Sequence, residues 1–314
     1  MKNISILFPK SEFTSGQLQK LSFVEPVSFV ESGKENDLAE LVRISKKVDI
    51  IAFPADRIGK KASQWLKTIL EKAPTIKAVA LDTVQADCID LAYCKEHGVV
   101  VTTVNDYSTE SVAEHVVGLL VACAKRILIN DRRTYRRKYQ PELGTDLRGK
   151  TLGIINVDKT GERVATLAKA FGMRVYLYNE PPFRMEGMER KSLREVLSRS
   201  DMITLHLPDT EENKKFLNKE RIGRLKDNCI VINLAGRSLV DEKAISRALL
   251  DGNVSQYVFE AESMKNSSLE GIETAIMLKP FSKLTIDSQM MKMELVAKNI
   301  VGLAVGKPYN PVSL

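Results

Sequence analysis

The residues that first suggest chemistry lie at positions 156–161, between an apolar run and a helical pattern. Leu152–Asn156 predicts a buried strand, and Gly161–Phe171 has helical spacing. A strand, a tight turn and a helix begin a mononucleotide-binding unit, whose turn normally carries Gly-x-Gly-x-x-Gly around a pyrophosphate. Here the six positions are Asn156, Val157, Asp158, Lys159, Thr160 and Gly161, so only the last glycine is present. The sequence therefore predicts the frame of a nucleotide-binding turn with altered phosphate chemistry.

Asp158 is the most consequential change in this turn. Asn156 is tolerable at the first glycine position, because asparagine visits the left-handed backbone region. A carboxylate at position 158 would face the pyrophosphate, and like charges ~4 Å apart repel by ~1 kcal/mol in water and ~4 kcal/mol at an effective dielectric near 20. Lys159 would offset part of this repulsion. We interpret Asp158 as an N-cap whose side chain binds the free N–H groups that phosphate otherwise uses.

The turn belongs to a chain in which short apolar strands alternate with helices. This alternation predicts parallel sheets flanked by helices, and we expect an α/β protein with two Rossmann-like, doubly wound domains. The predicted strands are 3–8, 49–53, 76–80, 98–102, 152–156, 174–178, 202–207, 229–233, 255–259 and 275–278. The predicted helices are 37–46, 63–72, 89–96, 108–127, 161–171, 241–250 and 287–305, with Asp241 as an N-cap.

Composition excludes several classes of protein. At 314 residues, with 44% hydrophobic and 28% charged residues, the chain has the balance of an ordinary globular protein, and no apolar run is long enough to span a bilayer. The four cysteines form no Cys-x-x-Cys pair, so we expect free thiols, a cytoplasmic location and no structural metal. The net charge is +7, and its densest cluster, at 132–138, is interpreted as a solvated helix end rather than a nucleic-acid site.

Several stretches together resemble the D-isomer-specific 2-hydroxyacid dehydrogenases, most closely the phosphoglycerate and glycerate dehydrogenase branch. They are 107–115 (Tyr-Ser-Thr-Glu-Ser-Val-Ala-Glu-His), the Leu-Gly-Ile-Ile strand, 206–210, 232–242 and 258–262. The resemblance implies a catalytic domain at 1–102 plus 284–314 and a nucleotide-binding domain at 103–283. It also implies a homodimer formed through the 108–127 helix region.

The same resemblance implies a catalytic histidine, glutamate and arginine, and the sequence departs from this set. The glutamate position matches Glu262. The usual arginine position holds Gly236, with Arg237 one residue later and, on an extended backbone, on the other face. The usual histidine position holds Phe281, which can neither accept nor donate a proton. Lys279 or Lys283 is the alternative acid.

The positions that the family uses for cofactor and substrate are altered as well. Asn179 stands where a second-strand aspartate normally binds the ribose, and Glu180 is the alternative for that contact. The anion-binding glycine loop is replaced by 83–85 (Thr-Val-Gln), with Asp82 beside it. The remaining cofactor-binding positions implied by the resemblance are His206, Pro208 and Thr210.

Three hypotheses follow from these residues. The first is a family member without the usual NAD-dependent hydride transfer, in which NAD or NADP binds weakly or not at all and the small-molecule ligand is unknown. The second is an NAD(P)-dependent oxidoreductase acting on a 2-hydroxy or 2-keto acid with a substituted catalytic set. The third, a nucleic-acid-associated protein using Arg132, Arg133, Arg136, Arg137 and Lys138, is the least favoured.

Overall fold

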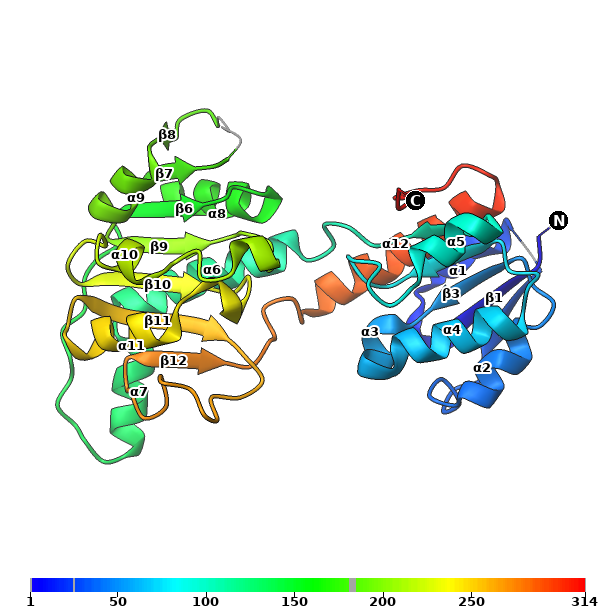
Figure 1. The fold of residues 1–314 in the computed structure, drawn as a ribbon, viewed down its shortest axis with the longest axis horizontal. Helices are drawn as coiled ribbons and strands as arrows, with labels where there is room; N and C mark the ends of the chain where they lie inside the picture. Colours follow the sequence, from blue (N-terminus) through cyan, green and yellow to red (C-terminus); the bar gives the residue numbers. More distant parts are fainter. Residues whose placement is uncertain (1, 25, 181–184, 314) are drawn as a thin grey trace. The chain divides into compact units, whose positions relative to one another are not determined.

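The computed structural model describes residues 2–24, 26–180 and 185–313, and the chain divides into two compact units. Unit 1 comprises Met1–Ser108 with Ile286–Leu314, and unit 2 comprises Thr109–Thr285. Each unit is a parallel sheet covered by helices, so the predicted α/β class with two such sheets is confirmed (Figure 1). The assignment of catalytic and nucleotide-binding roles to the two units stays a prediction.

Unit 1 is built on a five-stranded parallel sheet in the order β2-β1-β3-β4-β5. Its strands are β1 (Ile4–Pro9), β2 (Val27–Val30), β3 (Ile50–Phe53), β4 (Ala78–Leu81) and β5 (Val100–Thr102). The three middle strands are buried along their whole length, which explains their continuous apolar sequence.

Helices cover both faces of the unit 1 sheet. They are α1 (Ser15–Ser22), α2 (Leu38–Ser45), α3 (Ala55–Ile58), α4 (Ala62–Lys72), α5 (Leu91–His97) and α12 (Ile286–Ala304). One core lies beneath α2, α4 and α5, and a second lies beneath α1 and α12. Local chemistry fixes the helix ends: Asp37 and Asp90 cap α2 and α5 through their side chains, and Gly98 ends α5 in the left-handed conformation.

Unit 2 contains a seven-stranded parallel sheet in the order β12-β11-β10-β9-β6-β7-β8. Its strands are β6 (Thr151–Ile155), β7 (Arg174–Tyr178), β8 (Glu189–Arg190), β9 (Met202–Leu205), β10 (Cys229–Asn233), β11 (Val254–Glu260) and β12 (Ala275–Leu278). The order reverses at β6 and β9, which makes the carboxyl edge there the switch point at which open α/β sheets bind ligands.

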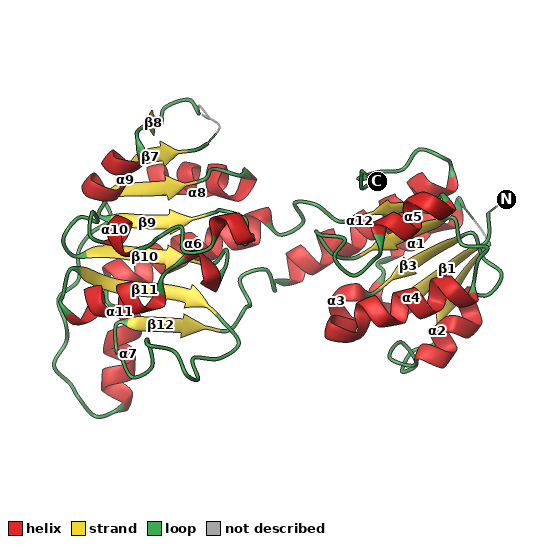
Figure 2. Cartoon of the chain, viewed as in Figure 1, coloured by secondary structure: helices red, strands yellow, loops and turns green. Residues whose placement is uncertain are grey.

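Two groups of helices bury the faces of the unit 2 sheet (Figure 2). One core includes side chains of α6 (Thr109–Ala124), α7 (Ile127–Tyr135) and α8 (Lys159–Ala170). The other includes side chains of α9 (Leu193–Arg199), α10 (Lys219–Ile222) and α11 (Glu242–Leu250). Asp241 caps α11, as predicted.

The sequence missed several elements and misread one. It gave no prediction for the short strands β2 and β8, and it predicted one helix over 108–127, whereas α6 ends at Ala124 and α7 begins at Ile127. Among the residues that the structure describes, no helix is both long and apolar enough to cross a membrane.

Candidate functional site

The parallel sheet of unit 2 gathers most of the predicted site residues at its carboxyl edge. The turn at 156–161 follows β6, Asn179 follows β7, His206 follows β9, and Gly236 and Arg237 follow β10. Glu262 follows β11, and Phe281 follows β12. Residues that are far apart in the sequence therefore share one edge because all seven strands run in the same direction.

Asn156 opens the turn in the left-handed conformation, with φ 63°. Its backbone N–H donates to the carbonyl of Tyr178 at 2.8 Å, and its Nδ2 donates to the carbonyl of His206 at 3.0 Å. Asn156 thus connects the ends of β6, β7 and β9, and a glycine at this position could not make the side-chain bond to His206. The predicted left-handed backbone at this position is confirmed.

Asp158 is the N-cap of α8, as the sequence predicted. Its Oδ1 accepts the backbone N–H of Gly161 at 2.7 Å, and half of its side chain is exposed. The free N–H of a helix end is what makes such a turn an anion site. The anion in this turn is therefore supplied by the chain itself.

The Asn179 side chain binds the backbone of Val157, in the middle of the turn. Its Oδ1 accepts the N–H of Val157 at 2.7 Å, and its Nδ2 donates to the carbonyl of the same residue at 3.2 Å. Glu180 is exposed, and burial and a hydrogen bond with Glu180 raise the pKa of Tyr178 to about 12. Asn179 is committed to backbone groups, so of the two predicted ribose contacts only Glu180 faces solvent.

His206 lies beneath the turn, and its side chain is 6% exposed. Its Nε2 is 3.2 Å from Oγ1 of Thr204, and its Nδ1 is 3.7 Å from Oδ1 of Asp158. Burial lowers the pKa of His206, so the ring is neutral near pH 7 and does not cancel the Asp158 charge.

The other predicted cofactor-binding residues lie in the turn after β9 and at the start of α8. The carbonyl of Pro208 accepts the N–H of Thr210 at 3.0 Å, which forms a tight exposed turn after β9. Lys159 is exposed at the first residue of α8, and Thr160 beside it is half-buried. The residues at this turn do not fit a pyrophosphate in the usual way, since Asp158 takes up one N–H and adds a negative charge.

Gly236, at the usual arginine position, has no room for a side chain unless Asp209 moves. Its φ of 173° is ordinary extended backbone, but a Cβ there would lie 2.5 Å from Cγ of Asp209. Asp209 in turn accepts a hydrogen bond from Ser238.

Arg237 is engaged within its own loop. Its guanidinium forms a two-point ion pair with Glu242, in which Nη2 lies 2.9 Å from Oε2, and its Nη1 donates to the carbonyl of Ser263 at 2.9 Å. A planar guanidinium paired in this way has little capacity left for a substrate carboxylate. The arrangement gives Arg237 a structural partner and leaves its predicted catalytic role untested.

Glu262 and Lys279 form an exposed pair. Nζ of Lys279 lies 2.9 Å from Oε2 of Glu262 and donates to the carbonyl of the same residue at 2.6 Å. The Glu262 side chain is 81% exposed, so this pair contributes little to stability.

Phe281 is held against α6 by its backbone and its ring. Its N–H and that of Ser282 donate to Oε1 of Glu260 at 3.0 and 2.8 Å, and Oγ of Ser111 donates to the carbonyl of Ser282 at 2.6 Å. The Phe281 ring contacts the ring of His115 edge-on, with centroids 5.0 Å apart.

His115 is a residue that the sequence did not assign to this site. Its Nε2 is buried and has no hydrogen-bond partner among the described residues. Burial lowers its pKa, and the nearby Glu260 carboxylate opposes that effect. No local pattern signals its position next to Phe281, because α6 and β12 meet only in the folded sheet.

Unit 1 contains a separate charged cluster around Asp82, the residue expected beside the altered anion loop. Asp82 is 2% exposed, and its Oδ1 accepts the N–H of Asp56 at 3.0 Å. Nζ of Lys292 lies 3.2 Å from Asp56 Oδ2 and 3.8 Å from Asp82 Oδ2. Burial raises the pKa of Asp82 to about 6. The sequence predicted the negative charge but missed Lys292, which comes from the last helix.

Metal-ligand side chains form no cluster in the part of the chain that the structure describes, and one arginine of the basic cluster is paired. No group of three or more His, Cys, Asp or Glu side chains is placed there to hold a metal ion. In the basic cluster, Arg133 forms an ion pair with Glu273 at 2.8 Å, so its charge is partly neutralised. The four cysteines are free thiols.

Comparison with known proteins gives a consistent result. Residues 117–280 match the NAD binding domain of the D-isomer specific 2-hydroxyacid dehydrogenases. The glyoxylate reductase of Pyrococcus furiosus is 30% identical over 294 residues, which cover 88% of this chain and 85% of that protein. The D-3-phosphoglycerate dehydrogenase of Methanocaldococcus jannaschii is 31% identical over 89% of this chain and 54% of that protein.

A solved structure extends the likeness to the fold of the chain. A glyoxylate reductase from Paecilomyes thermophila superimposes with a TM-score of 0.80 at 22% identity, covering 99% of this chain and 98% of that one. At that level of identity, the superposition concerns the fold alone.

Proposed function

This chain belongs to the D-isomer specific 2-hydroxyacid dehydrogenase family, and we propose that it binds a small ligand without the family's usual NAD-dependent hydride transfer. The family predicted from the sequence is confirmed. The proposal concerns activity, and it rests on one observation: the Asp158 carboxylate caps the Gly161 N–H at 2.7 Å, where an incoming diphosphate would need both the N–H and a neutral surrounding.

The magnitude of the charge repulsion supports weak cofactor binding. Repulsion of ~1 to ~4 kcal/mol between like charges ~4 Å apart corresponds to one to three orders of magnitude in affinity. Asn179 adds to the effect, because it occupies the Val157 N–H in the same turn. NAD or NADP would then bind weakly or not at all.

The residues at the proton-transfer and substrate-binding positions also support the absence of hydride transfer. Phe281 offers no titratable group, and Gly236 carries no guanidinium while Arg237 is paired with Glu242. Hydride reduction of a 2-keto acid needs a proton for the developing alkoxide, so loss of the donor removes a contribution of roughly 10²–10⁴ in rate.

Calorimetric titration with NADH tests the proposal with three variants. The wild-type protein is expected to give no saturable heat at micromolar NADH. Asp158→Gly removes both cap and charge, and Asp158→Asn keeps a good cap while removing the charge. Both are expected to bind NADH at least about tenfold more tightly. Glu162→Gln, which removes another charge from the first turn of α8, serves as the matched control.

A turnover assay completes the test. Wild-type protein is expected to show no saturable oxidation of NADH or NADPH with a panel of 2-keto acids that includes glyoxylate and pyruvate. Saturable turnover with any of them would end the proposal.

A second candidate is an NAD(P)-dependent reductase of a small 2-keto acid such as glyoxylate. The imidazole of His115 beside Phe281 favours it, since this group lies next to the place of the missing histidine. Lys279 and Lys283, which the sequence offers as the alternative acid, are the other proton donors considered for this second candidate. In this case His115→Gln would abolish turnover, whereas Lys279→Gln would identify the lysine if it acts instead.

We also propose that the protein forms a homodimer through the region around α6, in the cytoplasm. Large apolar side chains that stay exposed at the end of α7 and in the segment after it support this proposal: Tyr135 at 91%, Tyr139 at 74% and Leu143 at 91%. Sedimentation equilibrium tests it, and a monomer at micromolar concentration would contradict it.

A further inference from the structure

A hollow of about 410 Å³ lies at the amino edge of the unit 2 sheet. Its lining includes Lys150 just before β6, Asp201 just before β9, Asn228 just before β10 and Ser255 near the start of β11. The 156–161 turn follows the opposite end of β6, so this hollow cannot be part of a dinucleotide crevice. The volume is within the range of small-molecule sites.

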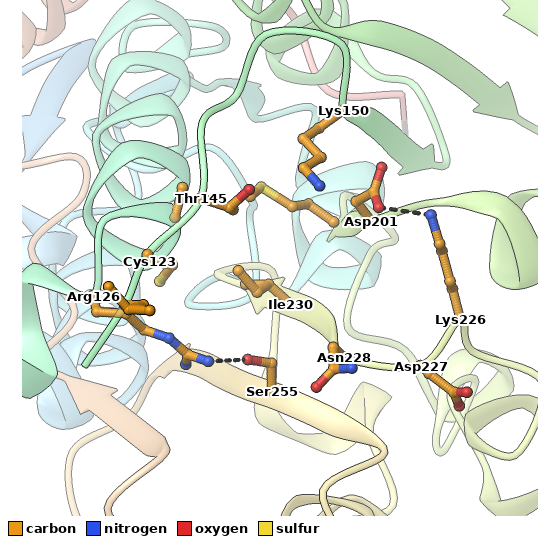
Figure 3. Close-up of a pocket in the computed structure, with 14 residues that line it drawn as sticks. Cys123, Arg126, Thr145, Lys150, Asp201, Lys226, Asp227, Asn228, Ile230 and Ser255 are labelled. Atoms are coloured by element: carbon orange, nitrogen blue, oxygen red, sulfur yellow. Dashed lines mark hydrogen bonds and ion pairs between the residues drawn. The ribbon is translucent and has the colours of Figure 1, made fainter.

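Three cationic side chains from different segments line the hollow: Arg126, Lys150 and Lys226. Figure 3 shows Lys150 and Asp201 on one side and Arg126 with Ser255 on the other. Nη2 of Arg126 donates to Oγ of Ser255 at 2.7 Å. The amino group of Lys150 forms no hydrogen bond or ion pair among the residues that the structure describes.

Acidic side chains cancel only part of this charge: Nε of Arg126 lies 3.8 Å from Oε2 of Glu142, and Lys226 pairs with Asp201. Asp201 is satisfied at both oxygens, by Nζ of Lys226 at 2.7 Å and by the N–H of Thr151 at 2.8 Å. The Asp227 carboxylate is turned away from Arg126 and Lys150 (Figure 3). Lys150 therefore supplies a positive charge without an ion-pair partner among the described residues, and Arg126 supplies one that Glu142 partly neutralises.

The cations are not needed to satisfy the end of α6. The carbonyl of Ala124 accepts the N–H of Thr145 at 2.7 Å, and the carbonyl of Cys123 accepts Nε2 of Gln256 at 2.9 Å. Apolar side chains, among them Ile230 and Met202, form part of the remaining wall. The hollow thus combines the Lys150 amino group with the Nη1 group of Arg126, which is buried and has no hydrogen-bond partner among the described residues, and with hydroxyl groups and an apolar surface.

We propose that this hollow binds a small organic phosphate monoester, with its phosphate between Lys150 and Arg126 and its organic part against Ile230 and Met202. Lysine binds phosphate as a point charge, and Nη1 of Arg126, next to the Nη2 that donates to Ser255, is the guanidinium group left free to donate to it. The site is independent of any dinucleotide, because it lies at the edge of the sheet opposite Asp158.

Calorimetric titration of the full chain with phenyl phosphate tests the site. Binding is expected for the wild-type protein and is expected to weaken by about tenfold or more in Lys150→Gln and in Arg126→Gln, since each removes a charge-assisted contact. Lys150→Arg is expected to keep binding, which separates loss of the contact from loss of the fold. Lys265→Gln, the same charge change at an exposed residue of unit 2 that does not line the hollow, is expected to bind like the wild-type protein.

Two further arms define the ligand and the site. Benzyl alcohol, which lacks the charge, is expected to give no heat, and Asp158→Gly is expected to leave the phenyl phosphate affinity unchanged. No heat with millimolar phenyl phosphate, or equal affinity in the wild-type, Lys150→Gln and Lys265→Gln proteins, would overturn the proposal.

Discussion

Gly236 and Asp209 are mutually dependent: a Cβ on Gly236 would lie 2.5 Å from Cγ of Asp209, whose carboxylate accepts a hydrogen bond from Ser238. The loop after β10 is therefore folded around a glycine at the position where the family carries its substrate-binding arginine. Restoring that arginine requires space as well as a new side chain.

This relationship predicts the outcome of restoring the arginine. Gly236→Arg alone is expected to destabilise the protein by about 1–2 kcal/mol, because Asp209 must leave Ser238. In an Asp209→Gly background, which also removes the Asp209 Cβ that would lie 2.7 Å away, the same substitution is expected to cost less than about 0.5 kcal/mol, since φ at 236 is ordinary extended backbone. Urea denaturation of the four proteins of this cycle gives the coupling. Equal costs in both backgrounds would show that Asp209 does not limit the space.

The buried carboxyl of Asp82 predicts a pH dependence. Burial raises its pKa from 3.8 to about 6, so between these values the native state binds more protons than the unfolded state. Stability contributed by Asp82 is then present below about pH 4 and is lost as the pH rises toward 6, on the order of 3 kcal/mol in total.

The measurement compares the wild-type protein with Asp82→Asn between pH 4 and 7. The free energy of unfolding of the wild-type protein is expected to fall relative to that of the variant across this range. Parallel curves for the two proteins would show that Asp82 titrates alike in the folded and unfolded states.

Lys292 predicts a second coupling in unit 1. Lys292→Met leaves Asp56 and Asp82 without their cation and is expected to cost about 3 kcal/mol at pH 7. Adding Asp82→Ala to Lys292→Met is expected to recover more than half of that loss, because the buried charge is removed with its partner. Thermal melts and urea denaturation of both variants measure the difference. An additive or greater loss in the double variant would contradict the pairing.

The sequence was informative where chemistry is local. Asn156 and Asp158 could be assigned correctly because a left-handed backbone and an N-cap depend on a few neighbouring residues. The alternation of strands and helices was sufficient for the fold class, since a buried parallel strand is a continuous apolar run.

The sequence did not predict contacts between segments that are distant along the chain. Lys292 reaches Asp82 from the last helix, and His115 meets Phe281 across two elements, so neither contact follows from spacing. Asn179 was predicted at the ribose position, but which backbone groups it binds depends on the separation of β6 and β7 in the folded sheet. The hollow beside Lys150 was missed for the same reason, because its walls come from separate crossovers.

Phe281 provides the last prediction. Phe281→His restores the usual proton donor, and it is expected to preserve the fold within about 1 kcal/mol, because the side chain is 43% exposed and the bond to Glu260 uses the backbone N–H. It is nevertheless expected to show no turnover of glyoxylate with NADH. A proton donor has no effect unless the cofactor is bound, and the Asp158 carboxylate still opposes binding of the cofactor at the turn. The variant that combines Phe281→His with Asp158→Gly, Gly236→Arg and Asp209→Gly is expected to give measurable turnover, with Phe281→Asn in the same background as the control. Turnover by Phe281→His alone would show that the turn accepts a dinucleotide despite Asp158 and that only the donor had been lost.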